Sequence, residues 1–291
     1  MTDKIILGTA QFGFNYGINN KYGKPSKKQV FKIFDYALKN NITTLDTAEA
    51  YGDCYSLIRE YKKLNPSINF KIYSKLDIRN VSETKTLEEN IMTSLRSLKH
   101  EYFEGYMFHS YNSFKKYNFL YDELINARKK GIIKKIGISL YSNGEIMDIV
   151  KNYNEFDFIQ APFNLLDNKV KREKEFKKLI KKNIEIQVRS VFLQGLFFKA
   201  PKDFPSKLQL LIPYIKTLKG IANTSKIDIK TLALKYVINK DYIKQIVIGI
   251  DNLTQLEKNL KIFNQEVDIL NEKIDSINVK EELLLNPSYW N

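Results

Sequence analysis

The chain has 291 residues and a formal net charge of +14 at pH 7, with 43% hydrophobic and 13% aromatic residues. This composition suits a large buried core, and the chain contains no run of about eighteen apolar residues that would cross a membrane. The apolar stretch near the N-terminus ends by Leu7, too early for a secretory signal. We therefore expect a cytoplasmic protein without a membrane partner.

Two further classes of site are excluded by residue types. Cys54 is the single cysteine, so no internal disulfide forms, and with two histidines we predict no metal site. Lysines are spread over every segment without the interleaved aromatic residues of a single-strand binder, so we predict no nucleic-acid partner.

Short β-branched or aromatic runs recur along the chain and predict eight strands. Their ranges are Lys4 to Ala10, Thr43 to Ala48, Phe70 to Leu76, Phe103 to Ser110, Ile133 to Leu140, Phe156 to Phe163, Glu185 to Phe192, and Ile243 to Ile250.

Helical periodicity separates these strands. Apolar residues fall on one face over Lys27 to Lys39 and over Leu87 to Leu98. Ser26 with Gln29 forms a capping-box signature, and Asn252 is placed to cap a helix over Thr254 to Phe263.

Strands that alternate with helices imply parallel pairing through right-handed crossovers, and eight of them predict an α/β fold, a closed (β/α)8 barrel. An open doubly wound sheet is the alternative. It would need a glycine-rich turn opening a helix, whereas the segment from Gly8 to Gly13 lacks the third glycine and is followed by a loop. We expect a single domain over 1–291, with the barrel over about 4–264 and a C-terminal extension over 267–291.

Four polar residues lie at or just after the ends of predicted strands two, three and four: Asp46, Tyr51, Lys75 and His109. In a barrel these ends surround the active-site mouth. Each residue has a plainer alternative, such as a turn cap for Asp46, a packing tyrosine, a solvated lysine or a structural histidine. The clustering at one end of consecutive strands favours a shared site.

Their chemistry suits the reduction of a carbonyl group, because the oxygen becomes alkoxide-like as hydride arrives and needs a proton. We expect Lys75 to lower the pKa of the Tyr51 phenol from its usual value of about 10, and Asp46 to keep Lys75 charged. His109 would hydrogen-bond the carbonyl oxygen.

The segment Asp46-Thr47-Ala48-Glu49-Ala50-Tyr51-Gly52 resembles the D-T-A-x-x-Y-G motif of the aldo-keto reductase family. Ser74-Lys75-Leu76 is similar to the family's third-strand lysine, and Phe108-His109-Ser110 to its fourth-strand histidine. The opening over 7–13 and the closing segment over 248–260 are also similar, so the resemblance runs from about residue 4 to 264.

The resemblance implies a nicotinamide cofactor lying extended across the barrel mouth. Thr9, Ser139 and Gln160 would surround the nicotinamide. Ser190 and the turn through Gln194 and Gly195 would hold the pyrophosphate. Gln255 and Asn259 would approach the adenine. In an alternative interpretation, Gln160 and Asn164 only form hydrogen bonds with main-chain groups at a strand end.

Three positions depart from the family pattern. Leu140 stands where many relatives have Asn, and Arg189 where many stack an aromatic ring on the nicotinamide. Asp251 stands where relatives place a cation for the 2′-phosphate of NADP, although Lys258 or Arg189 would compensate if close enough. NADP(H) is favoured by the family, and NAD(H) is the alternative.

The substrate expected from the resemblance is a small-molecule aldehyde or ketone, with a sugar-derived carbonyl as one class. Gln11, Phe12, Phe14 and Tyr16 follow the first strand and are expected to form the pocket wall. Two alternative functions remain open, a regulatory barrel that binds cofactor with negligible turnover and a redox-neutral sugar epimerase. The sequence does not determine the oligomeric state.

Overall fold

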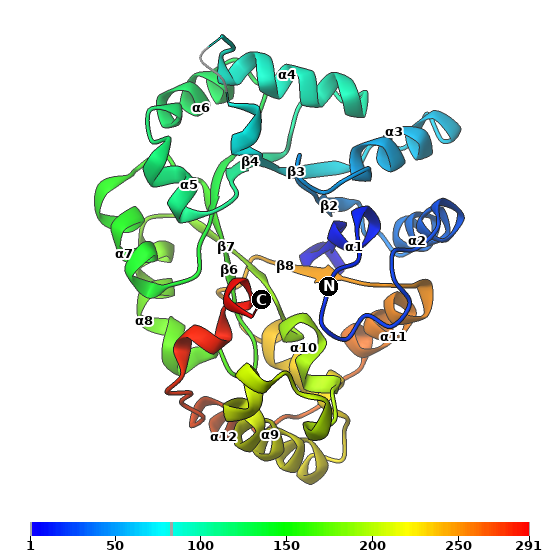
Figure 1. Ribbon diagram of the computed structural model, residues 1–291, viewed down its shortest axis with the longest axis vertical. Helices are drawn as coiled ribbons and strands as arrows, with labels where there is room; N and C mark the ends of the chain where they lie inside the picture. Colours follow the sequence, from blue (N-terminus) through cyan, green and yellow to red (C-terminus); the bar gives the residue numbers. More distant parts are fainter. Residues whose placement is uncertain (1, 82–83, 291) are drawn as a thin grey trace.

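A computed structural model describes residues 2–81 and 84–290 of the chain. Eight parallel strands form a closed barrel in sequence order, with helices around it (Figure 1). The strands are β1 (Ile5–Gly8), β2 (Thr44–Asp46), β3 (Lys71–Leu76), β4 (Gly105–Phe108), β5 (Ile136–Ser139), β6 (Phe158–Pro162), β7 (Glu185–Arg189) and β8 (Gln245–Gly249).

The first and last strands close the barrel. β1 pairs in parallel with β8 from Ile5 opposite Ile246 to Gly8 opposite Gly249. This pairing excludes the open doubly wound sheet, in which two edge strands would remain. The predicted (β/α)8 barrel is confirmed.

Each strand lies within its predicted range and is shorter than that range. Ile243 and Ile250, for example, flank β8 and are buried although they are outside the strand. Apolar residues at strand ends pack beneath the surrounding helices, so burial extends further along the chain than the ladder of hydrogen bonds.

The helices are α1 (Ala10–Gly13), α2 (Lys27–Lys39), α3 (Cys54–Leu64), α4 (Leu87–Leu98), α5 (Tyr111–Lys116), α6 (Leu120–Lys129), α7 (Asn143–Asn152), α8 (Lys169–Lys181), α9 (Ile212–Thr224), α10 (Ile229–Ile238), α11 (Leu253–Asn264) and α12 (Asn271–Asp275). The predicted capping box of Ser26 with Gln29 starts α2, and Asn252 caps α11. The single turn α1 was not predicted, because four residues carry no helical periodicity.

The half of the barrel nearer the N-terminal ends of the strands is filled by large side chains. Ile6, Tyr73, Met107 and Phe158 form a buried cluster, in which the rings of Tyr73 and Phe158 meet edge to face at 5.2 Å. A Cβ atom on Gly137 would lie 2.2 Å from the Phe158 ring, so glycine makes room for it. These side chains plug the barrel, so a ligand cannot pass through it from one end to the other.

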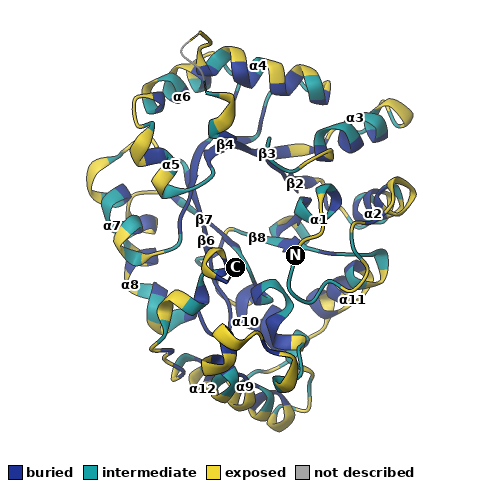
Figure 2. Cartoon of the chain, in the orientation of Figure 1, coloured by how far each residue is buried: buried dark blue, intermediate teal, exposed yellow. Residues whose placement is uncertain are grey.

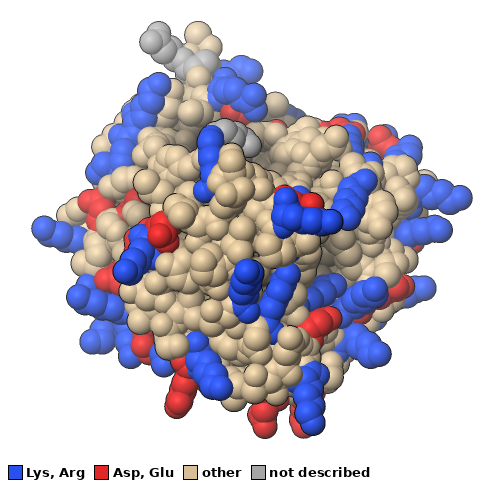
Figure 3. All heavy atoms as spheres, turned by 60° about the horizontal axis from the view of Figure 1, so that its bottom comes forward, with Lys and Arg blue, Asp and Glu red and all other residues tan. Residues whose placement is uncertain are grey.

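The strands and the inner sides of the helices are buried and the outer sides of the helices are exposed, as the dark blue and yellow parts of Figure 2 show. Lysines and arginines are dispersed over the face in Figure 3, with acidic residues among them. In the described part of the chain, no helix has the length and apolarity to span a membrane.

The C-terminal segment returns to the end of the barrel formed by the C-terminal ends of the strands, toward the middle of the ring in Figure 1. Glu282 pairs with Lys171 in the first turn of α8 at 2.7 Å, and Glu281 accepts from Tyr214 in α9 at 3.2 Å. Trp290 is buried in the core and its Nε1 donates to the Leu284 carbonyl, so it anchors the chain end.

Candidate active site

A layer of polar residues lies directly above the apolar plug. Because side chains alternate along a strand, a residue two positions after a plug residue points into the same interior. Lys75 follows Tyr73 in this way, and Gln160 follows Phe158. The alternation of side chains thus places these residues on the interior face, and the closed barrel brings them together from distant parts of the sequence.

Asp46 and Lys75 form an ion pair at the centre of this layer. Lys75 Nζ lies 2.6 Å from Asp46 Oδ2 and also donates to the Thr47 carbonyl at 3.1 Å. Gln160 Nε2 donates to the other carboxylate oxygen of Asp46 at 2.7 Å. Burial lowers the pKa of Lys75, while the Asp46 carboxylate opposes that change. The pair is held rigidly from both sides.

Gln187, which the sequence reasoning missed, extends this network. It is fully buried in β7, its side-chain oxygen accepts from Gln160 at 3.3 Å, and its Nε2 donates to Gln245 at 3.0 Å. The available sequence signal was its position two residues before Arg189 in the same predicted strand, which places both side chains on the interior face of the barrel.

Tyr51 lies in the loop between β2 and α3 and reaches over the ion pair. Lys75 Nζ is 5.1 Å from the centroid of its ring, and the His109 ring centroid is 5.8 Å away. Asp46, Tyr51, Lys75 and His109, predicted to converge, are brought together by the structure.

The protonation of Tyr51 differs from the sequence expectation. Burial raises its pKa well above the usual 10.0, and the negative charge of Asp46 adds to the rise. The expectation that Lys75 would lower this pKa is wrong here, because Asp46 neutralises Lys75 and the phenolate would lose its hydration. The phenol keeps its proton throughout the neutral range.

His109 is also uncharged. Burial, together with the positive charge of Lys75, lowers its pKa to about 4. A neutral imidazole can donate one hydrogen bond without adding positive charge.

A cavity of about 630 Å³ opens beside this layer, a volume typical of small-molecule sites. Seven of the nine predicted cofactor residues line it: Gln160, Arg189, Ser190, Gln194, Gly195, Gln255 and Asn259. Of the four predicted pocket residues, Gln11 and Tyr16 line it, and the predicted catalytic residues Asp46 and Tyr51 line it as well. Residues of the loop before α2 line it as well, and Gln194 Nε2 donates to the Tyr16 hydroxyl at 3.2 Å across the opening.

Several predicted residues lie elsewhere. Phe12 packs edge-on against Phe34 in the core and is 1% exposed, so the prediction that it walls the pocket is wrong. The turn α1 directs its side chain inward. Thr9 is fully buried and its hydroxyl donates to the Asp46 carbonyl, so it joins β1 to β2 instead of lining the cavity. Phe14 is partly exposed and packs edge-on against Tyr16 and Tyr51.

Ser139 lies beneath Arg189. Ser139 is buried, and its hydroxyl accepts from Arg189 Nη2 at 3.4 Å. The alternative interpretation of Gln160 as a main-chain partner is not what the structure has, since its amide binds Asp46. It does hold for Asn164, whose side-chain oxygen accepts from the main-chain N–H groups of Leu166 and Asp167.

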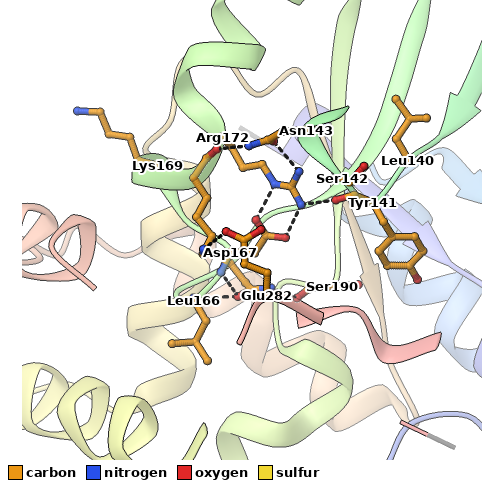
Figure 4. Close-up of polar contacts among 12 residues, drawn as sticks. Leu140, Tyr141, Ser142, Asn143, Leu166, Asp167, Lys169, Arg172, Ser190 and Glu282 are labelled. Carbon is orange, nitrogen blue, oxygen red and sulfur yellow. Dashed lines mark hydrogen bonds and ion pairs between the residues drawn. The ribbon is translucent and has the colours of Figure 1, made fainter. Parts of the chain in front are cut away.

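The guanidinium of Arg189 stacks on Tyr141, with its carbon 4.1 Å from the ring centroid. Arg172 holds the loop that carries Tyr141, as Figure 4 shows. Its Nη2 donates to the Tyr141 carbonyl, its Nη1 donates to Asn143, and its Nε lies 2.6 Å from Asp167. This buried pair fixes the wall behind Arg189.

Three lysines line the cavity: Lys230 and Lys258 from α10 and α11, and Lys21 from the loop before α2. Lys258 was foreseen as a possible compensation for Asp251, whereas Lys230, at the start of α10, was missed. Asp251 itself accepts from Gln255 Nε2 at 3.0 Å. Lys230 follows the helix cap Asp228, but only the packing of α10 against α11 shows that it reaches this cavity.

One structural observation indicates that a nicotinamide dinucleotide fits these residues. The side-chain oxygen of Asn259 is buried and has no hydrogen-bond partner among the described residues, although Asn259 lines the cavity. An amino group such as that of adenine would satisfy it. No cluster of three or more His, Cys, Asp or Glu side chains suited to a metal occurs within residues 2–81 and 84–290.

Solved structures share the fold. An aldo-keto reductase from Bacillus halodurans, solved in a holo form, aligns with a TM-score of 0.70 at 17% identity, covering 96% of this chain and 94% of that chain. An aldo-keto reductase enzyme from a Medee basin deep-sea metagenome library aligns with a TM-score of 0.67 at 19% identity, covering 94% and 90%.

No curated protein matches the sequence significantly. The model of the Aldo/keto reductase family matches residues 4–279, which is nearly the whole chain and includes every residue of the polar layer. The chain is an oxidoreductase that belongs to the aldo/keto reductase family.

Proposed function

We propose that the chain reduces an aldehyde or ketone to an alcohol, with Tyr51 as the proton donor. The supporting observation is the protonated phenol of Tyr51 placed over the buried Asp46–Lys75 pair, inside the cavity. When bound, the nicotinamide cofactor supplies the hydride to the carbonyl carbon. The carbonyl oxygen then takes the Tyr51 proton.

The surrounding residues support this proton transfer. Once Tyr51 has given its proton, the positive charge of Arg189, which lowers the Tyr51 pKa, stabilises the phenolate, and the Lys75 ammonium lies 5.1 Å from the centroid of its ring. The uncharged His109 donates an N–H to the substrate oxygen and orients it. Water then returns the proton to Tyr51.

Replacing Tyr51 tests the assignment. We expect Tyr51→Phe to lower kcat by at least about a hundredfold, the usual contribution of a positioned general acid, while NADPH affinity stays within a factor of two. NADPH consumption is followed with glyceraldehyde and 4-nitrobenzaldehyde as probes. Tyr289→Phe, on an exposed tyrosine, is the matched control. Full activity of Tyr51→Phe would remove Tyr51 from the mechanism.

Net consumption of NADPH also separates the alternatives. An epimerase would isomerise a sugar without net oxidation of cofactor, and a regulatory barrel would bind cofactor without turnover.

For the cofactor we propose NADP(H) over NAD(H). Lys230 and Lys258 line the same end of the cavity as Gln255 and Asn259, and neither forms an ion pair within 4.0 Å among the described residues. Burial lowers the pKa of Lys230, the nearby Asp228 carboxylate opposes this change, and the charge of Lys258 adds to it. A dianionic 2′-phosphate would relieve the repulsion between the two lysines.

Titration of intrinsic fluorescence with NADPH and NADH tests this preference. We expect NADPH to bind at least about tenfold more tightly, and Lys230→Gln with Lys258→Gln to weaken NADPH alone. Lys244→Gln, at the opposite end of the barrel, is the control. Equal affinity for both cofactors in the wild type would support NAD(H) instead.

The part of the cavity wall formed by Gln11, Tyr16, Gln194 and Phe198 suits a polyhydroxylated carbonyl compound. Gln11 and Gln194 offer amide groups, and Tyr16 and Phe198 offer aromatic surface around the same cavity. Aromatic faces with a few amide groups bind sugar rings through apolar contact and hydrogen bonds. A sugar aldehyde is therefore the substrate class that we would assay first.

A further inference from the structure

Arg189 places a positive charge in the part of the cavity beside Asp46 and Tyr51, which we call its catalytic end. This charge has no carboxylate partner among the described residues. Arg189 ends β7 and lines the cavity together with Asp46, Tyr51 and Gln160. Among the residues that the structure describes, no Asp or Glu oxygen lies within 4.0 Å of its guanidinium.

The contacts of Arg189 are all with neutral groups. Its Nη2 donates to Ser139 Oγ at 3.4 Å and to the Leu140 carbonyl at 3.3 Å, and its Nη1 donates to Ser190 Oγ at 3.3 Å. These bonds are long, and the other face of the guanidinium packs on the Tyr141 ring. The positive charge is therefore held in place but not neutralised.

The other ionised groups nearby cancel in pairs. Lys75 is matched by Asp46 at 2.6 Å, and Arg172 by Asp167 at 2.6 Å. His109 is uncharged because burial lowers its pKa to about 4. Among the described residues, Arg189 therefore keeps its charge at this end of the cavity without a counter-ion.

Arg189 is close enough to act electrostatically on the reacting groups. Burial raises the pKa of Tyr51 well above its usual value, and the charge of Arg189 opposes that rise. The carbonyl carbon that receives hydride is bonded to the oxygen that receives the Tyr51 proton. A nicotinamide ring that delivers this hydride must therefore come within a few ångströms of Tyr51, and so into the field of Arg189.

The two redox forms of the cofactor differ by one charge on this ring, since oxidised nicotinamide is a cation and reduced nicotinamide is neutral. We propose that Arg189 selects the reduced cofactor, because its unneutralised charge repels the oxidised ring. The site would load reduced cofactor from a mixed pool and release the oxidised form readily. This inference rests on the proposed function, which places a nicotinamide beside Tyr51.

The expected size follows from Coulomb's law. At an effective dielectric constant of about 20, two unit charges about 4 Å apart change a binding equilibrium by roughly three orders of magnitude, and charges about 10 Å apart still change it by roughly one order. We expect the dissociation constant of NADP⁺ to exceed that of NADPH by at least about tenfold.

Fluorescence titration with NADPH and NADP⁺ on purified protein tests this selection without any substrate. Arg189→Gln, which removes the charge, should bring the ratio of the two dissociation constants toward one, and Arg189→Lys should keep most of it. Lys258→Gln is the matched control. It should weaken both cofactors by the same factor and leave the ratio unchanged, since both carry the same 2′-phosphate.

Several outcomes would overturn the inference. Equal affinity for NADPH and NADP⁺ in the wild type would do so even if the Arg189 variants fail to fold. An unchanged ratio in Arg189→Gln, with a higher KM for carboxylated aldehydes such as glyoxylate, would assign Arg189 to substrate binding. Absence of saturable binding by either cofactor would instead reject the proposed function itself.

Discussion

Desolvation determines the charge of each group around the Asp46–Lys75 pair. The buried phenol of Tyr51 and the buried imidazole of His109 stay neutral, since an uncompensated charge there would lose its hydration. Lys75 keeps an adjacent carboxylate, which offsets the effect of burial on its pKa. At the residue scale, the centre keeps its phenol protonated and its imidazole uncharged at neutral pH.

This arrangement predicts the pH dependence of the reaction. A raised pKa keeps Tyr51 protonated through neutral pH, so kcat/KM for carbonyl reduction should stay level from about pH 6 to pH 9. Alcohol oxidation needs the phenolate as base and should rise about tenfold per pH unit over this range. Steady-state rates in both directions measure the two profiles. A decline of reduction with a midpoint between pH 6 and 9 would mean that Lys75 lowers the Tyr51 pKa once cofactor is bound.

At the scale of elements, the loop that carries Tyr51 is positioned by two glycines. Gly52 adopts a positive φ of 54°, a left-handed conformation that favours glycine. Gly13, at the end of α1, lies so close that a Cβ atom would be 2.1 Å from the Tyr51 carbonyl oxygen. The turn α1 and the Tyr51 loop therefore support each other.

We expect Gly13→Ala to displace the Tyr51 loop and lower kcat by at least about tenfold, since a shift of about 1 Å in a reacting group is costly. Gly220→Ala is the matched control, because nothing lies within 4 Å of a Cβ atom at this position in α9. The control should keep wild-type kcat and gain about 0.5–1 kcal/mol in stability. Wild-type kcat in Gly13→Ala would show that the loop tolerates the displacement.

The Asp167–Arg172 pair is a second determinant at this scale, because it joins α8 to the loop that carries Tyr141. Both side chains are buried, so Arg172→Met leaves Asp167 uncompensated and should cost about 3–5 kcal/mol of unfolding free energy. Urea denaturation measures the loss. The double variant Arg172→Met with Asp167→Leu should recover much of it, and a loss below about 1 kcal/mol in the single variant would contradict this role.

At the scale of the whole molecule, the cavity is lined by β1 and α1 near the start of the sequence and by β8, α10 and α11 toward its end, together with residues of β2, β6 and β7. A ligand bound there connects the first and last units of the closed barrel. Binding to the folded state alone stabilises it by about 2.7 kcal/mol at a ligand concentration one hundred times the Kd.

We therefore expect saturating NADPH to raise the melting temperature by several degrees, and NADP⁺ at the same concentration to raise it less. Thermal denaturation followed by circular dichroism measures both shifts. Lys244→Gln should behave as the wild type, because Lys244 lies at the other end of the barrel. No shift with either cofactor would contradict the cofactor site.

The sequence by itself determined the eight strand-and-helix units and the convergence of Asp46, Lys75 and His109. These depend on local periodicity: apolar runs predict strands, and the alternation of side chains places the polar residues at one end. The start of α2 was also predictable, because a capping box involves only residues three apart.

Only the tertiary structure decided the features that depend on distant segments. The pairing of β1 with β8, the location of Phe12 against Phe34, and the neighbourhood of Lys230 and Lys258 all require the chain to close on itself. The Tyr51 pKa belongs to this group as well, because desolvation and the charge of Asp46 depend on the packing around the phenol and not on the motif. Burial is a property of the folded barrel, and no local pattern encodes its amount.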